Sequence, residues 1–330
     1  MGSNASSVVF GWDFQINAAI VLMLDNIQEV QKVRVEGKTE DIELTLINEN
    51  MIYSQAKSVV KIDDYRNVLS NFKKALKTLG NAAENRDYDK LIYITNTPNP
   101  FNNLETMPAF REKTDINFHD LPEKCKDVIS EALREKPDCK IDVSKLYIQV
   151  IPFHTNNLPN RYKVVKQSVN EFLAFLDNTI LGFSNKILDV WQGDLFKNSS
   201  QTDTTITIKK SEFIWPIVVI VSEINEYDKN LQEIDEIDIQ EIVLRYRDII
   251  NNKVDRFEFA TKVISDFNSF QSQSSQRSTE FINSEWESYK DEFSIGLIDD
   301  DLIEKLIKII IYKIISKRYL INSIKTKVKL

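Results

Sequence analysis

The clearest pattern in this chain is a change in the spacing of apolar residues within its first sixty positions. Residues 12–31 carry apolar side chains at the three- and four-residue intervals of an amphipathic helix. Residues 32–37 then alternate between apolar and polar, and residues 41–47 and 51–59 repeat this alternation on either side of the turn-like sequence NEN. The pattern predicts a helix followed by three strands, the last two joined as a hairpin.

Helical spacing returns after the hairpin. We expect Asp63 and Asp64 to cap a helix that reaches about Leu79, because acidic residues are favoured at helix N-termini. The order of elements up to the next strand is then αβββαβ. The same patterns predict the rest of this half: a buried strand at 90–98, a helix at 122–135, a strand at 145–153 and one long helix at 160–191.

A change in composition divides the chain. Residues 197–205 are rich in Ser, Thr and Asn, which is typical of a linker, and the sequence beyond them is rich in Ile, Glu and Lys at helical spacing. We therefore predict an α/β domain at 8–195 and a mainly α-helical domain for assembly or regulation at 206–330. The run from Ile303 to Ile315 is apolar around much of its helix, so this chain, a second copy or a regulatory subunit must cover it.

Composition excludes several classes of site. The chain has 330 residues, of which 42% are hydrophobic and 28% charged, so a folded core is expected. Its seven glycines are not spaced as a dinucleotide fingerprint or a Walker loop. Cys125, Cys139, His119 and His154 are too few and too scattered for a disulfide framework or a zinc site. The net charge of −8 opposes general attraction to nucleic acid, although a cleft can still be locally basic. With no long uncharged apolar segment, a cytoplasmic protein without a membrane partner is expected.

The hairpin carries the candidate chemistry. Alternation places Asp41 and Glu43 on one face of the second strand, and Gln55 and Lys57 on one face of the third. Carboxylate and amide oxygens suit Mg²⁺, or Mn²⁺, and a lysine stabilises charge during phosphodiester hydrolysis. Asp41 would be the main metal ligand, Gln55 a neutral ligand and Lys57 the catalytic cation. Glu36, at the end of the first strand, is a further metal candidate, whereas Glu43 can simply pair with Lys57. The competing interpretation is a solvated strand face.

These residues and their order resemble the PD-(D/E)xK nuclease superfamily, in the variant whose second acid is glutamine. FGWDFQINAAIVLML, VRVEGKTEDIEL and YSQAKS are similar to the nuclease domain of prokaryotic anti-phage effectors, including those of CBASS and Lamassu systems. The resemblance covers roughly residues 8–195 and implies a restriction-endonuclease-like fold and Mg²⁺-dependent cleavage of double-stranded DNA. It matches Asp41, Gln55 and Lys57 to the D…QxK motif, and Gln15 to a polar residue of the first helix.

The resemblance also implies a regulated enzyme. A nuclease without sequence specificity would destroy its host, so we expect a partner that holds it inactive. The Lamassu resemblance implies an SMC-like ATPase subunit and a homo-oligomer when the nuclease is active. Two alternatives remain at this point: a restriction-type endonuclease whose helical half recognises DNA, or a catalytically weak DNA-binding or scaffold module.

Overall fold

The computed structural model describes residues 5–84, 87–136, 141–222, 256–273, 275–292 and 300–330. They divide into two compact units, residues 1–210 and residues 211–330, which are described separately below. Unit 1 is a mixed α/β structure, and the described part of unit 2 is helical.

A seven-stranded sheet is the centre of unit 1, in the order β5-β6-β4-β3-β2-β1-β7. The parallel pairs are β3 with β4 and β4 with β6, and the remaining neighbours are antiparallel. The strands are β1 (Val30–Val35), β2 (Ile42–Leu46), β3 (Met51–Lys57), β4 (Tyr88–Thr95), β5 (Thr114–Asn117), β6 (Leu146–Val150) and β7 (Ile208–Lys209).

The alternation seen in the sequence is present in the β2–β3 hairpin. Ile42, Leu44 and Leu46 are buried, while the residues between them are half-buried. The register pairs Ile42 with Ser54 and Leu44 with Ile52, so these side chains share a face. Nearly all of β3 is buried, as expected for a strand in the interior of a sheet that is covered on both faces.

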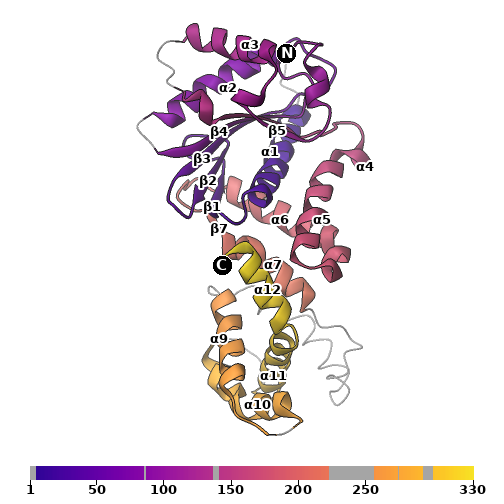
Figure 1. Cartoon of the computed structure of the whole chain (residues 1–330). Coiled ribbons are helices and arrows are strands. Elements are labelled where there is room, and N and C mark those ends of the chain that lie inside the picture. Colours follow the sequence, from indigo (N-terminus) through magenta and orange to yellow (C-terminus); the bar gives the residue numbers. More distant parts are fainter. Residues whose placement is uncertain (1–4, 85–86, 137–140, 223–255, 274, 293–299) are drawn as a thin grey trace. The chain divides into compact units, whose positions relative to one another are not determined.

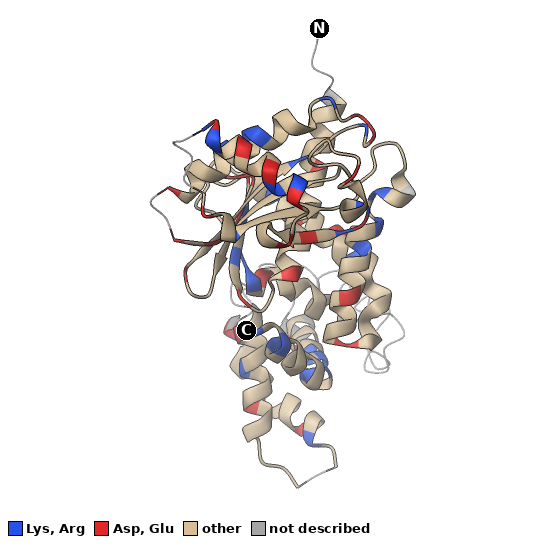
Figure 2. Ribbon diagram, turned by 45° about the horizontal axis from the view of Figure 1, so that its top comes forward, with Lys and Arg blue, Asp and Glu red and all other residues tan. Residues whose placement is uncertain are grey.

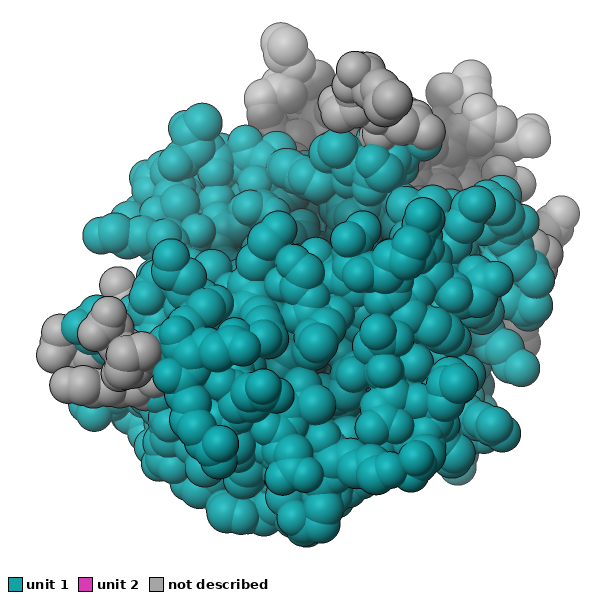
Figure 3. Space-filling view, turned by 90° about the horizontal axis from the view of Figure 1, so that it is seen from above, with its two compact units in different colours: residues 1–210 teal, residues 211–330 magenta. Residues whose placement is uncertain are grey.

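Helices cover the two faces of the sheet (Figures 1 and 2). On one face lie α1 (Ala5–Asp25), α5 (Lys163–Leu176) and α6 (Ser184–Ser199); on the other lie α2 (Val68–Ala83) and α3 (Glu123–Arg134). By length and composition, the segment Ser6–Asp25 could cross a membrane, but 61% of its apolar window is buried within the protein, as in a core helix. Figure 3 shows one face of unit 1, the upper face in the view of Figure 1.

Aromatic contacts fix α2 over the middle of the sheet. The Phe72 ring of α2 packs edge-on against Tyr93 of β4 and against Phe101, with centroid separations of 5.1 Å in both cases. All three side chains are almost fully buried. Burying an aromatic side chain of this size contributes about 2–3 kcal/mol, so this cluster holds the middle of α2, and the residues that follow it, against β3 and β4.

The αβββαβ order is confirmed, but several predicted boundaries are wrong. The first helix ends at Asp25 instead of continuing to residue 31, because the chain turns and enters β1 at Val30. The second helix begins at Val68 and not at Asp63 or Asp64; the Asp64 side chain accepts a hydrogen bond from the Arg66 backbone N–H in the preceding loop. Apolar periodicity located both helices but did not locate their ends.

The long helix predicted at 160–191 is several elements. The chain forms α4 (Leu158–Arg161), α5, the 3-10 helix η4 (Asn178–Phe183) and then α6. Asp177 has an extended backbone, and its side chain accepts a hydrogen bond from the Thr179 N–H, so it ends α5 and begins the next turn. The short strands β5 and β7 were not predicted.

The predicted linker at 197–205 lies within unit 1. Its first residues belong to α6, and the buried Arg34 guanidinium of β1 binds one carbonyl at the end of α6 and two carbonyls beyond it. Arg34 donates to Asn198 O at 2.6 Å, Gln201 O at 2.7 Å and Ile206 O at 3.0 Å. These bonds hold the segment against β1, where β7 then pairs with Lys32 and Val33.

The described part of unit 2 consists of helices, most of which pack on the apolar helix that contains Ile303 to Ile315. They are α7 (Lys210–Val221), α9 (Arg256–Ser269), α10 (Arg277–Glu285), the 3-10 helix η6 (Trp286–Glu292), α11 (Asp300–Ser316) and α12 (Arg318–Val328). The isoleucines and Leu306 between Ile303 and Ile315 are buried by packing of α11 on α9, α10, η6 and α12. The chain itself therefore covers the apolar run from Ile303 to Ile315. This is the first of the three explanations given above, and it needs neither a second copy nor a regulatory subunit.

Candidate functional site

Asp41, Gln55 and Lys57 meet at the end of the β2–β3 hairpin. The Asp41 Oδ2 atom accepts hydrogen bonds from the Gln55 side-chain amide and from the Ala56 backbone N–H, the latter at 2.9 Å. The Lys57 Nζ atom lies 3.5 Å from the same oxygen. Among the described residues, no hydrogen bond reaches Asp41 Oδ1. The acid is thus fixed through one oxygen while the other is uncommitted, and its side chain is 16% exposed.

Thr78 of α2 holds the other end of the Gln55 amide. The Thr78 Oγ1 atom lies 2.7 Å from Gln55 Oε1 and 3.0 Å from the Ala75 carbonyl. In this orientation the amide nitrogen faces Asp41, and the amide oxygen faces α2. A hydroxyl both donates and accepts, so Thr78 could also accept from the Gln55 nitrogen while donating to Ala75. Turning the amide over would then direct its oxygen toward Asp41 without leaving Thr78 unpaired.

Glu36 and Gln15 lie at the same end of the sheet. The Glu36 N–H donates to the Asp41 carbonyl at 2.8 Å, so the two residues close a tight loop. Burial raises the pKa of Glu36 and the negative charge of Asp41 adds to the rise, whereas a hydrogen bond from Gln15 opposes it. Glu36 has a φ of 52°, in the left-handed region, which costs a residue with a side chain roughly 1–2 kcal/mol. The structure therefore brings both residues close to Asp41.

Glu43 organises this loop. Its Oε1 atom accepts hydrogen bonds from the Thr39 N–H at 2.8 Å and from the Glu40 N–H at 3.1 Å. Among the described residues, the ion pair of Lys57 is with Asp41, so the alternative in which Glu43 simply pairs with Lys57 is not found. Gly37 leaves room for the Glu43 carboxylate, because a Cβ atom there would lie 2.3 Å from Glu43 Cδ.

Glu40 is an acid in this loop that the strand pattern does not identify as a site residue. Its side chain is 4% exposed, and neither carboxylate oxygen has a hydrogen-bond partner among the described residues. Burial raises the pKa of Glu40 to about 8, and the charge of Asp41 adds to the rise, while Lys57 opposes it. A buried acid therefore lies next to Asp41 at this end of the hairpin, and the Lys57 ammonium offsets part of the negative charge of the two acids.

The donor atoms at this site are of the kind that Mg²⁺ or Mn²⁺ takes. Carboxylate and amide oxygens are hard ligands, and Mg²⁺ usually keeps several waters, so it needs few protein ligands. Within the described residues, no group of three or more His, Cys, Asp or Glu side chains has the spacing of a metal site. The fit of a cation therefore depends on three side chains. They are Asp41, chiefly through its uncommitted oxygen, the carboxylate of Glu40 and the amide of Gln55.

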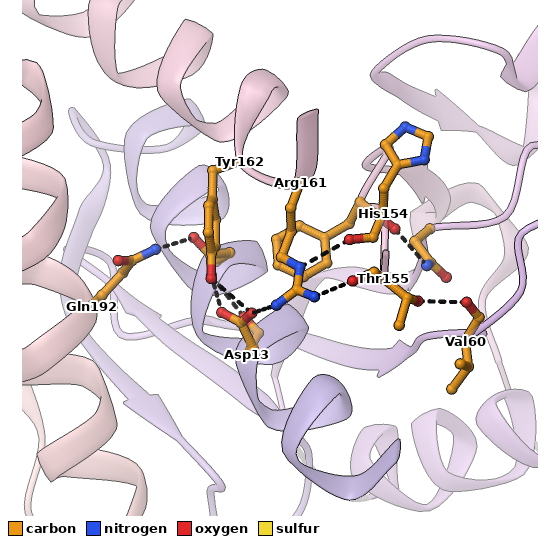
Figure 4. A network of polar contacts seen from close by, with 10 residues as sticks. Asp13, Val60, His154, Thr155, Arg161, Tyr162 and Gln192 are labelled. Atoms are coloured by element: carbon orange, nitrogen blue, oxygen red, sulfur yellow. Dashed lines mark hydrogen bonds and ion pairs between the residues drawn. The ribbon is translucent and has the colours of Figure 1, made fainter. Parts of the chain in front are cut away.

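A second polar network holds the N-terminal part of α1 in place (Figure 4). The Arg161 guanidinium lies 3.2 Å from Asp13 Oδ2 and donates to the His154 carbonyl at 2.9 Å, and the Tyr162 hydroxyl donates to Asp13 at 2.9 Å. Burial raises the pKa of Asp13 despite these partners. Because Gln15 follows two residues later on α1, this network helps to set the position of that side chain.

Of the other residues considered in the sequence, those that the structure describes lie away from this site. The His154 ring points away from the Asp13 network in Figure 4, and His119 is exposed and packs edge-on against Phe118. Cys125 is a buried free thiol whose pKa is raised by burial. Cys139 lies outside the described residues.

Comparisons with known proteins were made against families, curated proteins and solved structures. No family model and no curated protein matches the chain. Two solved structures of an Acinetobacter baumannii Cap4 SAVED/CARF-domain containing receptor, with the cyclic trinucleotides 2'3'3'-cAAA and 3'3'3'-cAAA, are similar at 13% identity, with TM-scores of 0.39 and 0.38. The matches cover 64% and 76% of this chain and 45% and 59% of the receptor chains. The chain thus matches about half the length of those receptors, a likeness too distant to assign a function.

Proposed function

We propose that unit 1 is a metal-dependent endonuclease of the restriction-endonuclease-like class that hydrolyses double-stranded DNA. The observation that supports this most strongly is the convergence of the Gln55 amide and the Lys57 ammonium on Asp41 Oδ2, with Oδ1 uncommitted. The sequence resemblance to PD-(D/E)xK nucleases assigns the D…QxK motif to the same three residues. The strained backbone of Glu36 beside Asp41 also supports a functional site, because such strain is concentrated at sites of chemistry or binding.

The proposed roles follow from the chemistry of the side chains. Asp41 would hold a divalent cation, assisted by Glu36 and by the Gln55 oxygen in its turned orientation. When bound, the cation would neutralise phosphate charge and lower the pKa of an attacking water. Lys57 is 35% exposed, so its ammonium can reach a phosphate while remaining beside Asp41, where it would stabilise the charge that develops on the phosphate oxygens. Gln15 would keep Glu36 oriented.

The test is plasmid cleavage by the full chain in Mg²⁺ or Mn²⁺. We expect Asp41→Ala and Lys57→Ala to lose at least a hundredfold in rate, since each removes a transition-state interaction. Lys61→Ala is the matched control, because Lys61 is an exposed lysine on the loop after β3 and has no contact with Asp41. Wild-type cleavage by a folded Lys57→Ala protein would refute the proposed catalytic role.

Gln55 gives a sharper test of its proposed role as a ligand. Gln55→Glu should retain cleavage or tighten cation binding, because it introduces the carboxylate that is usual in the superfamily. Gln55→Leu should remove activity, because leucine supplies no oxygen ligand. If Gln55→Leu cleaves DNA like the wild type, the D…QxK match has no catalytic meaning.

A specific observation favours a second function, a catalytically weak DNA-binding or scaffold module. In the orientation described, the Gln55 nitrogen faces Asp41 and its oxygen is bound by Thr78, which is a closed network that needs no cation. This alternative predicts that DNA binding is unaffected by EDTA and that no variant at Asp41 or Lys57 changes a cleavage rate. Binding and cleavage assays on the same preparation separate the two functions.

Regulation by a partner is proposed from the resemblance to Lamassu nucleases. We propose that an SMC-like ATPase subunit holds the enzyme inactive and that release allows it to oligomerise on DNA. An adjacent gene for such an ATPase would support this, whereas an adjacent methyltransferase gene would support a restriction enzyme. Light scattering with DNA and metal tests the assembly: a monomer that makes double-strand breaks at full rate would contradict it.

A further inference from the structure

The buried acid Glu40 has no partner in the described part of the protein. Its side chain is 4% exposed, and neither carboxylate oxygen makes a hydrogen bond of good geometry with a described residue, although the Thr78 hydroxyl lies close enough to act on the carboxyl. Buried polar groups normally have a hydrogen bond, so an exception calls for an explanation such as strain, a catalytic role or a missing ion.

The surroundings of Glu40 place its carboxyl group at the proposed nuclease site. The backbone on either side is held, because the Glu40 N–H donates to Glu43 and its carbonyl accepts from the Gly37 N–H at 3.0 Å. The charges of Asp41 and Lys57 act on the carboxyl, and so does the Thr78 hydroxyl, which approaches it without the geometry of a full hydrogen bond. Since Thr78 also binds Gln55, Glu40 lies on the α2 side of the hairpin, with the other donor groups.

We propose that Glu40 is a second carboxylate ligand of the divalent cation held by Asp41, an inference that rests on the proposed function. A cation at this position would give the Glu40 oxygens the partner that they lack. It would also offset the repulsion between two neighbouring carboxylates, one of which is buried. With Asp41, Glu40 and the Gln55 oxygen, the site would have the few oxygen ligands that Mg²⁺ requires in addition to water.

The competing interpretation is a buried neutral carboxyl that has only a structural role. The two differ in what an isosteric amide does. If Glu40 is a ligand, Glu40→Gln removes a charge from the site and weakens cation binding. If Glu40 is structural and neutral, the amide fills the same space, and cation binding does not change.

The experiment measures Mn²⁺ binding to the full chain by electron paramagnetic resonance of the free ion, which does not depend on activity. We expect Glu40→Gln to raise the Kd at least tenfold and Asp41→Asn to abolish binding. Glu40→Asp, which keeps the charge on a shorter side chain, should have an intermediate Kd. Glu49→Gln is the control for loss of one negative charge, because Glu49 lies at the other end of the hairpin, and its Kd should equal that of the wild type.

The outcomes separate this inference from the proposed function. A wild-type Kd in Glu40→Gln, with binding lost in Asp41→Asn, overturns the role of Glu40 and leaves the nuclease site in place. Absence of Mn²⁺ binding by the wild type overturns both. Thermal melting without metal shows whether Glu40→Gln is folded. If it is not folded, Glu40→Asp decides: a wild-type Kd in that variant overturns the inference, and a raised Kd supports it.

Discussion

Replacing Gly37 by alanine should disturb the loop that carries Glu40 and Asp41. The added Cβ atom would lie 2.3 Å from Glu43 Cδ and 2.6 Å from both Cγ and Oε1, so the Glu43 side chain must move. That carboxylate accepts the N–H groups of Thr39 and Glu40, and both bonds would be lost or lengthened.

The magnitude can be estimated from these two bonds. A hydrogen bond to a charged group contributes about 1.5–3 kcal/mol, which gives an upper limit of roughly 3–6 kcal/mol for the pair. The loop is half-exposed around Thr39, so water can replace part of the loss, and we expect Gly37→Ala to lower the free energy of unfolding by about 1–3 kcal/mol. For a unit of this size, the melting temperature should fall by roughly 3–10 °C.

The assay is thermal and urea denaturation of four proteins: the wild type, Gly37→Ala, Glu43→Ala and the double variant. With Glu43 truncated, the three atoms nearest to the new Cβ are removed, so the cost of Gly37→Ala should nearly disappear in that background. Gly193→Ala is the control, because nothing lies within 4 Å of its added Cβ in α6, and alanine should stabilise a helix interior by up to about 1 kcal/mol. An equal cost of Gly37→Ala in both backgrounds would refute this explanation.

Three further predictions concern the residues that support the site. Thr78→Val should leave the Gln55 amide without its α2 partner and weaken Mn²⁺ binding several-fold, measured by isothermal titration, whereas Thr78→Ser should restore it; equal affinity in Thr78→Val would show that the hydroxyl is not needed. Burial raises the pKa of Asp13 above its ordinary value of 3.8, so the folded state binds the Asp13 proton more tightly than the unfolded state does. The free energy of unfolding should therefore fall as pH rises from 3.8 through the raised pKa. Urea titrations across this window should show a smaller dependence of that free energy on pH in Asp13→Asn, and an unchanged dependence would contradict the assignment. Arg34→Met should cost about 3 kcal/mol or more, because it leaves carbonyls that the guanidinium binds without a donor; urea denaturation would show this, and Arg34→Lys should recover only part of the loss.

Much of the candidate site followed from alternation along the strands. A period of two places Asp41 and Gln55 on one face, and the short NEN turn sets the register that makes them neighbours. Thr78 could not be identified in this way, because the spacing of a helix does not say which sheet residue each side chain meets. Glu40 was missed for a different reason: a polar residue before a strand is usually solvated, and only the fold shows that this one is buried.

The fold was predictable where an element was long and its pattern strong. The strands β5 and β7 have the sequences TDIN and IK, which are too short to show a period, and they form because the edges of an existing sheet offer hydrogen bonds. The break at Asp177 was hidden because apolar spacing continues across it. Its cause is local, a side-chain hydrogen bond to the backbone two residues on.

The attachment of residues 198–209 to β1 has a consequence for synthesis of the protein on the ribosome. Arg34 is made early, whereas the carbonyls that it binds at residues 198, 201 and 206 and the strand that pairs with Lys32 and Val33 are made much later. Until then, the nascent sheet has an unpaired edge at β1 and a cation without its partners. Open strand edges promote pairing with other chains. We therefore expect this protein to be prone to aggregation during the interval between emergence of β1 and emergence of residue 209, and a fragment ending at residue 195 to remain in that condition.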